Sequence, residues 1–296
     1  MRPVRVDDLD ALESRFQHAF MTGDDDGLDV IGYGEITSVV AWSGPDGLVA
    51  AKRLPAFPGG EGVSAYLSVF GDYVEGLRDA GVDVVPTTAQ QVTLRNGDIA
   101  VYLLQPMIDE RLLGHKYLSD AEEDDAVVLL LDRVLDGVES AIGSGVGLDA
   151  QISNWALVDD SVVYFDVTTP LLRDEAGRDR LDTGIFLASL PWPLRGAVRR
   201  FMVRGIIDEY FDVRTTMLNL LAQFYKERLA HLIPLGLDRA NARLERPIAP
   251  EEVRRYYAKD ARLWEFLQQL RRVDRWWHLR VLRRAYSFLL PGRVER

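Results

Sequence analysis

Strand signals in this chain are confined to its first 170 residues, and this asymmetry limits the folds that the chain can adopt. The β-rich runs LDVIG, ITSVVAW and LVAAKRL follow one another between residues 28 and 54. A hairpin is predicted where TAQQVTL and IAVYLLQ flank RNGD, because Asn-Gly favours a two-residue turn. Beyond Pro170 only helical patterns remain, over about residues 180–290. The order predicts an α+β protein with a β-rich first half and a helical second half.

Apolar residues recur at helical spacing in segments on either side of the predicted hairpin. A helix is expected at residues 6–20, and another over residues 63–80, where Tyr66, Phe70, Tyr73 and Leu77 share one face. A further helix is expected from Asp120 to Ile142, where an acidic start suits the positive end of the helix dipole. Residues 147–170 then read as a short hairpin embedded among helices.

Charge and composition narrow the class of partner. The chain has 296 residues, a formal net charge of −11 and no cysteine, so disulfide and thiolate chemistry are excluded. An acidic chain is a poor nucleic-acid binder, because phosphate binding needs a basic surface. No apolar run approaches the roughly 18 residues of a membrane span, and the first residues lack the apolar core of a signal peptide. We expect a soluble, cytoplasmic protein.

A glycine turn and a lysine follow in the β-rich half. Gly32 and Gly34 lie between two predicted strands, where backbone amides can approach a phosphate closely. Lys52 ends the run Val-Ala-Ala-Lys, and it is one of only four lysines in the chain. Glu75 is expected to pair with this amine, with two alternatives left open, namely Asp72 and Glu61. Each feature also has an ordinary interpretation, as a tight turn and as a lysine at a sheet edge.

Three polar residues surround the second predicted hairpin. Asp149 is followed by Asn154 at five positions, and Asp166 comes directly after an apolar run that suits a buried strand. Turns favour Asp and Asn, which is one explanation of the pattern. The other explanation is that the three side chains face one metal-bound phosphate, since carboxylate and amide oxygens suit Mg²⁺.

Taken in order, these motifs resemble the protein-kinase-like superfamily, in particular its small-molecule branch of aminoglycoside phosphotransferase and choline kinase relatives. The resemblance covers about residues 29–170. It implies a bilobal fold, with an N-terminal helix over residues 1–25, a nucleotide-binding N-lobe over 26–105 and a helical C-lobe over 106–296 that carries the catalytic hairpin 147–170. The small lobe would bind ATP, and the acceptor would be a hydroxyl group of a small molecule.

The resemblance also implies residue roles. Asp149 would be the catalytic base, and Mg²⁺ on the phosphates of ATP would be held by Asn154 and Asp166. The residues implied to bind the nucleotide are Gly32, Gly34, Lys52, Glu75, Gln105, Pro106 and Met107. The nucleotide base would lie against the last three, in the segment that joins the lobes. Phosphoryl transfer depends mainly on the placement of cations and one base, so this division of roles is chemically coherent.

The chain departs from the family pattern at several positions. GLD at 147–149 replaces His-x-Asp, DVT at 166–168 replaces Asp-Phe-Gly, and Thr37 stands where the phosphate loop has its third glycine. An Ala-Pro-Glu motif is missing, which argues against a typical protein kinase. Two alternatives therefore stay open: a pseudokinase that acts as a nucleotide-binding scaffold, and a kinase that modifies Ser or Thr of a peptide.

The last 46 residues differ in charge from the rest of the chain. Residues 251–296 hold 12 basic and 6 acidic side chains, interleaved with aromatic ones such as Trp264, Phe266 and Trp276. One interpretation is a basic amphipathic helix that contacts an anionic membrane or a phosphorylated substrate. The other, which we expect, is a terminal helix that packs its aromatic face on the acidic body.

Overall fold

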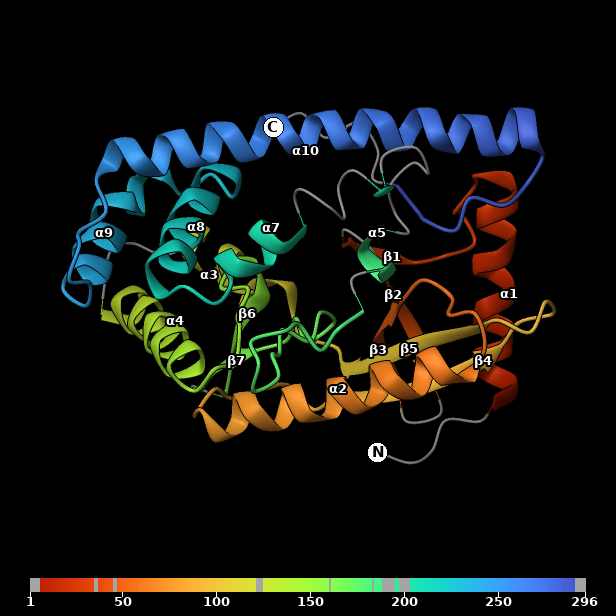
Figure 1. Ribbon diagram of the computed structural model, residues 1–296, viewed down its shortest axis with the longest axis horizontal. Helices are drawn as coiled ribbons and strands as arrows, with labels where there is room; N and C mark the ends of the chain where they lie inside the picture. Colours follow the sequence, from red (N-terminus) through yellow and green to blue (C-terminus); the bar gives the residue numbers. More distant parts are fainter. Residues whose placement is uncertain are drawn as a thin grey trace.

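The computed structural model describes residues 6–34, 37–44, 47–120, 125–159, 161–182, 184–187, 195–196 and 203–290. Its mixed α+β architecture confirms the predicted fold class (Figure 1). A five-stranded antiparallel sheet has the strand order β1-β2-β3-β5-β4, and its members are β1 (Val30–Tyr33), β2 (Ser38–Gly44), β3 (Gly47–Arg53), β4 (Thr88–Thr93) and β5 (Ile99–Pro106). Both predicted hairpin strands are therefore present, as β4 and β5.

Two helices cover opposite faces of the sheet. Helix α1 (Val6–Thr22) packs on one face, where alternate residues of the strands, such as Val40 and Leu104, contribute to a buried cluster. Helix α2 (Gly60–Asp79) lies on the other face, with Tyr66 and Tyr73 buried against the sheet and the helices beyond it. The two faces are separated by the period-two alternation of the strands.

A short hairpin connects the sheet to the helical half. Strands β6 (Trp155–Val158) and β7 (Ser161–Tyr164) pair antiparallel, and the turn between them begins at Asp159, which has a positive φ of 48°. The backbone of Tyr164 also bonds to the segment after α2: its N–H donates to Asp83 at 2.7 Å, and its carbonyl accepts from Val85 at 3.0 Å. These bonds fix the chain that follows β7 next to the sheet.

The rest of the described chain is mostly helical, as predicted. The elements are η1 (Glu110–Leu112), α3 (Gly114–Asp120), α4 (Asp125–Gly143), η2 (Ile152–Asn154), α5 (Gly184–Leu187), α7 (Val203–Glu209), α8 (Val213–Lys226), η3 (Ala230–Leu232), α9 (Ile233–Asn241), α10 (Pro250–Trp276) and η4 (Trp277–Leu282). The larger buried cluster runs without a break from the α2 face of the sheet into α4 and α8. The division at residue 105 into two lobes stays a prediction.

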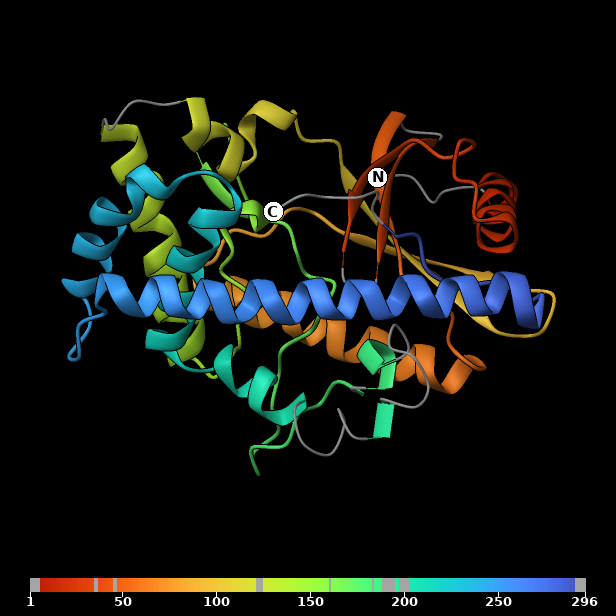
Figure 2. The same cartoon turned by 90° about the horizontal axis from the view of Figure 1, so that it is seen from above.

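Helix α10 is the longest helix of the described chain, with 27 residues, or about 40 Å at 1.5 Å per residue. It lies along one outer edge of the molecule, from α9 at one end to the vicinity of α1 at the other (Figures 1 and 2). Arg275 near its C-terminal end donates a hydrogen bond to the carbonyl of Gly23, just after α1. The helix therefore ties the helical part to the part that contains the sheet.

Candidate functional site around Lys52

Lys52 near the end of β3 carries a buried amine. It pairs with Val39 on one side and Leu103 on the other, so its side chain leaves the sheet on the face that α2 covers. Nζ donates to the backbone carbonyl of Phe165 at 2.8 Å and lies 3.4 Å from Oδ1 of Asp166. The Lys52 side chain is 7% exposed, whereas that of Asp166 is 36% exposed. One partner of this ion pair is therefore dry, and the other is in contact with solvent.

The amine of Lys52 is under-compensated electrostatically. Burial lowers the pKa of Lys52, and this effect outweighs the opposing influence of the charge and hydrogen bond of Asp166. Within the part of the chain that the structure describes, Asp166 is the one carboxylate that contacts Nζ. A second negative group next to Nζ would therefore be bound favourably.

Gln105 at the end of β5 supports the same carbonyl. Its side chain is 3% exposed, and Nε2 donates to both Thr87 Oγ1 at 2.9 Å and the Phe165 carbonyl at 2.8 Å. The Phe165 carbonyl thus accepts from a lysine and an amide at once. Pro106 and Met107, which follow Gln105, are exposed, Met107 by 38%.

Thr168 holds the carboxylate of Asp166. Its hydroxyl donates to Oδ1 at 2.9 Å, and its own carbonyl accepts from the buried hydroxyl of Tyr66 on α2. Oδ1 is therefore shared by Thr168 and Lys52, while Oδ2 has no contact among the described residues. Thr168 thus has a defined structural role, as it links Asp166 to α2.

Hydrogen bonds through the backbone connect Lys52 to Asp149 and Asn154. The carbonyl of Phe165 accepts from Lys52, and its N–H donates to the carbonyl of Asn154 at 3.0 Å. The side-chain amide of Asn154 in turn donates to the carbonyl of Asp149 at 3.1 Å. The four residues that sequence reasoning singled out therefore lie along one continuous network of hydrogen bonds, and both Asp149 and Asn154 are only partly buried.

The packing around Gly147 leaves no room for a side chain at that position. A Cβ at Gly147 would lie 2.9 Å from Leu171 Cβ and 2.9 Å from the ring of Phe211, so no side chain fits without a shift. The Gly147 carbonyl accepts from the hydroxyl of Tyr73 on α2 at 3.1 Å. The loop before Asp149 is therefore braced by neighbouring aromatic residues, without a histidine.

The register of the sheet brings Gly32 into line with Lys52, two strands away. Gly32 pairs with Val39, and Val39 pairs with Lys52. A Cβ at Gly34 would lie 2.4 Å from Thr37 Oγ1, so the threonine that replaces the third glycine requires glycine at position 34. The tip of the turn, residues 35–36, lies outside the described residues.

The predicted pairing of Glu75 with Lys52 is wrong. Glu75 is exposed on α2, and no contact between it and Lys52 exists. Nine residues separate Glu75 from Tyr66, which is about 180° around a helix, so one of them faces outward when the other faces the sheet. The alternative Asp72 instead pairs with Arg180, and Glu61 is exposed.

Sequence reasoning missed a second group of polar residues, which lies beside Asp149. Gln151 donates from its amide to Asp149 Oδ2 at 3.3 Å and accepts from Lys226 of α8 at 3.4 Å. His115 of α3 has a buried Nδ1 without a partner among the described residues. Burial lowers the pKa of His115, with the nearby Glu227 opposing this effect. The sequence offered one indication of Lys226, namely that it is one of only four lysines in the chain.

Fold and site together define a mixed α+β protein with a candidate anion site around one buried lysine. The chain belongs to a family of unknown function, DUF6206, whose model matches residues 11–275. No curated protein matches the sequence. Among solved structures, the M. tuberculosis PknI kinase domain is similar at 16% identity and a TM-score of 0.34, over 66% of this chain and 70% of that chain. We therefore base the function proposed below on side-chain geometry.

Proposed function

We propose that this chain is a phosphotransferase that uses ATP and Mg²⁺ to phosphorylate a hydroxyl group of a small molecule. The observation that carries the proposal is the buried amine of Lys52, whose only carboxylate contact among the described residues is a 3.4 Å contact with Asp166. A phosphate oxygen would supply the missing negative charge, and removal from water strengthens that attraction. Gly32, which is in register with Val39 and through it with Lys52, adds no side chain, so a phosphate could approach the backbone there.

The residues present fit a magnesium ion. Asp166 has a free carboxylate oxygen, Oδ2, in the described structure. Asn154 uses its amide nitrogen to bond to Asp149, which leaves its side-chain oxygen as a ligand. Hard oxygen ligands are the ones Mg²⁺ prefers, and the ion would neutralise charge on the transferred phosphoryl group.

Asp149 is the proposed base, and Gln151 orients it. The Gln151 amide and backbone N–H both contact the Asp149 carboxylate, at 3.3 and 3.4 Å. Such a positioned carboxylate can accept the proton of an attacking hydroxyl group. The nucleotide base would lie against the exposed residues Pro106 and Met107. The Gln105 side chain is not available to it, because its amide already donates to Thr87 and to the carbonyl of Phe165.

The proposal is tested first by nucleotide binding and then by turnover. Mg²⁺-ATP at 100 times its dissociation constant should raise the free energy of unfolding by about 2.7 kcal/mol. Transfer of label from radiolabelled ATP to a panel of hydroxylated small molecules would identify the acceptor. Asp149→Asn should lower turnover by about 10²- to 10⁴-fold, because a general base contributes that much, and should leave Mg²⁺-ATP binding unchanged.

One observation favours a second candidate, a nucleotide-binding scaffold without catalysis. The Gln151 amide bonds to Asp149 Oδ2, which is an oxygen that a base would use. If Gln151 holds this oxygen away from the acceptor hydroxyl, the chain would bind nucleotide without transferring phosphoryl. Mg²⁺-ATP stabilisation without transfer to any acceptor, in both the native chain and Gln151→Ala, would select the scaffold.

A further inference from the structure

The C-terminal half of α10 exposes apolar side chains and buries polar ones at several positions. Residues of this half that face the protein include Gln268 and Arg271, which are 7% and 5% exposed. Residues that face outward include Phe266, Val273 and Trp276, which are 56%, 64% and 56% exposed. A helix that served only to pack on the body would place these groups the other way round. The expectation that this segment buries its aromatic face is therefore wrong for these residues.

Three exposed apolar side chains of α10 lie on one face of the helix. Positions 266, 273 and 276 recur at intervals of seven and three residues, so they share one face of the helix. In η4 the exposed apolar side chains are Trp277, Val281 and Leu282. We call the set Phe266, Val273, Trp276, Trp277, Val281 and Leu282 the apolar stripe. The helix that carries most of it runs along one side of the molecule (Figure 2).

The charge next to the apolar stripe is strongly positive. Residues 262–284 contain seven arginines against two acids, a net charge of +5 on a chain whose total is −11. Arg262, Arg280, Arg283 and Arg284 are exposed, and their side chains have no partner within the described residues. Exposed apolar groups and unpaired arginines therefore occupy the same edge.

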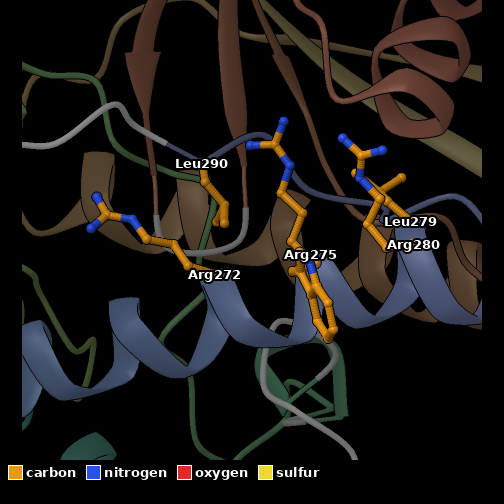
Figure 3. A pocket seen from close by; sticks show the side chains of 6 residues that line it. Arg272, Arg275, Leu279, Arg280 and Leu290 are labelled. Carbon is orange, nitrogen blue, oxygen red and sulfur yellow. The ribbon is translucent and has the colours of Figure 1, made fainter.

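A basic pocket lies beside the stripe. It has a volume of about 320 Å³ and is lined by Arg272, Arg275, Trp276, Leu279, Arg280 and Leu290. Figure 3 shows the labelled arginines of α10 and η4 spread along one side of the helix, with Leu290 across from them. Such a pocket combines positive charge with an apolar wall, which suits a phosphate ester that carries a hydrocarbon chain.

We propose that residues 262–284 bind the surface of a membrane that contains anionic phospholipid, with the apolar stripe inserted at the headgroup boundary and the arginines at the phosphates. The pairing of aromatic and aliphatic residues with arginine is the pattern of helices that lie in a membrane interface. Among the described residues no helix is long and apolar enough to cross a bilayer, so the contact lies on the surface. The aliphatic members Val273, Val281 and Leu282 offer no face on which a nucleic-acid base can stack, and a second copy would bring two positive edges together.

The test is co-sedimentation of the full chain with vesicles of phosphatidylcholine alone and of phosphatidylcholine mixed with phosphatidylglycerol. Binding is expected only to the anionic vesicles and should weaken as salt is raised. Arg283→Gln/Arg284→Gln should weaken binding about 30-fold, since each basic residue near an anionic surface contributes about fivefold. The matched control is Arg254→Gln/Arg255→Gln, an exposed pair on the same helix outside the stripe, which should bind as the native chain does.

A second variant separates insertion from electrostatic attraction. Brominated phospholipids should quench tryptophan fluorescence in the native chain, and Trp276→Ser/Trp277→Ser should remove that quenching with an unchanged thermal midpoint. Equal binding to neutral and anionic vesicles, or none at low salt, would overturn the proposal. A dimer in light scattering that Trp276→Ser/Trp277→Ser dissociates, without vesicle binding, would assign the stripe to a second copy of the chain instead.

Discussion

Lys52 and Arg53 are neighbours on β3, and their side chains leave opposite faces of the sheet into different electrostatic surroundings. Arg53 Nε and Nη2 bond to the two carboxylate oxygens of Glu13 on α1 at 2.8 and 2.7 Å, and both side chains are buried. Lys52 has a partly exposed carboxylate at 3.4 Å and a carbonyl. The Arg53–Glu13 pair is fully hydrogen-bonded within itself, whereas the positive charge of Lys52 is only partly compensated.

The pKa directions express the same difference. Burial, the largest influence in both cases, lowers the pKa of each cation. For Arg53 the hydrogen bonds and charge of Glu13 outweigh burial, and the pKa lies above its ordinary value. For Lys52 the influence of Asp166 is too small, and the pKa lies below its ordinary value. A saturated pair leaves no charge available to a ligand, and an unsaturated cation is suited to bind one.

The largest expected effect comes from breaking the saturated pair. Arg53→Met leaves the Glu13 carboxylate buried without its cation, and the free energy of unfolding should fall by about 3–5 kcal/mol. Urea unfolding followed by circular dichroism measures it. Glu13→Leu/Arg53→Met, which removes both charges, should recover most of the loss. If Arg53→Met alone changed stability by less than about 1 kcal/mol, the pair would not be the closed, buried unit described here.

A smaller difference in stability is expected between the hydroxyl groups that donate to the carboxylates of Glu13 and Asp166. Tyr102 donates to Glu13 in a buried site, so Tyr102→Phe should cost about 2 kcal/mol. Thr168 donates to Asp166, which is partly hydrated, so Thr168→Val should cost about 1 kcal/mol or less. Thermal unfolding of both variants under one buffer ranks them. The reverse order would mean that Asp166 depends on its internal partners more than Glu13 does.

The contribution of Lys52 to the free energy of unfolding is expected to depend on pH. A lysine whose folded pKa is lowered binds fewer protons than in the unfolded chain, so its contribution to stability rises with pH from the folded pKa toward 10.5. Below the folded pKa, Lys52→Met should leave stability unchanged or raise it by up to about 1 kcal/mol. The difference between native chain and variant should shrink as pH rises through that window. A constant difference would show that Lys52 is not destabilised by burial.

The smallest effect is expected at Glu75. Because its side chain is exposed on the outer face of α2 and far around the helix from Tyr66, Glu75→Gln should change stability by less than about 0.5 kcal/mol and leave Mg²⁺-ATP binding unchanged. Titration calorimetry alongside urea unfolding checks both quantities. A clear loss of nucleotide affinity would mean that α2 rotates on binding and brings Glu75 to Lys52.

Local patterns predicted the fold class and the elements that carry the site. Asn-Gly turn chemistry gave the β4–β5 hairpin, and the α2 helix followed from the spacing of Tyr66, Phe70, Tyr73 and Leu77. The sequence also singled out Lys52 and Asp166, which the structure places 3.4 Å apart across 114 residues of chain. Their roles in binding ATP and Mg²⁺ stay predictions.

Contacts that depend on how whole elements dock could not be read from the sequence. Arg53 and Glu13 are 40 residues apart, and their pairing requires that α1 lie on the outer face of the sheet. Helix α10 illustrates the same limit, because the sequence predicted burial of its aromatic face and the docked orientation leaves Phe266 and Trp276 exposed. Amphipathicity fixes which residues share a face, and tertiary packing decides which face is covered.

The most direct test of the central claim is urea unfolding of the native chain and of Lys52→Met, each with and without Mg²⁺-ATP at 100 times the native dissociation constant. We predict that the nucleotide adds about 2.7 kcal/mol to the native chain and nothing to the variant, while the variant alone is at least as stable as the native chain. Equal stabilisation of both proteins by Mg²⁺-ATP, or a variant that is several kcal/mol less stable without ligand, would contradict the account.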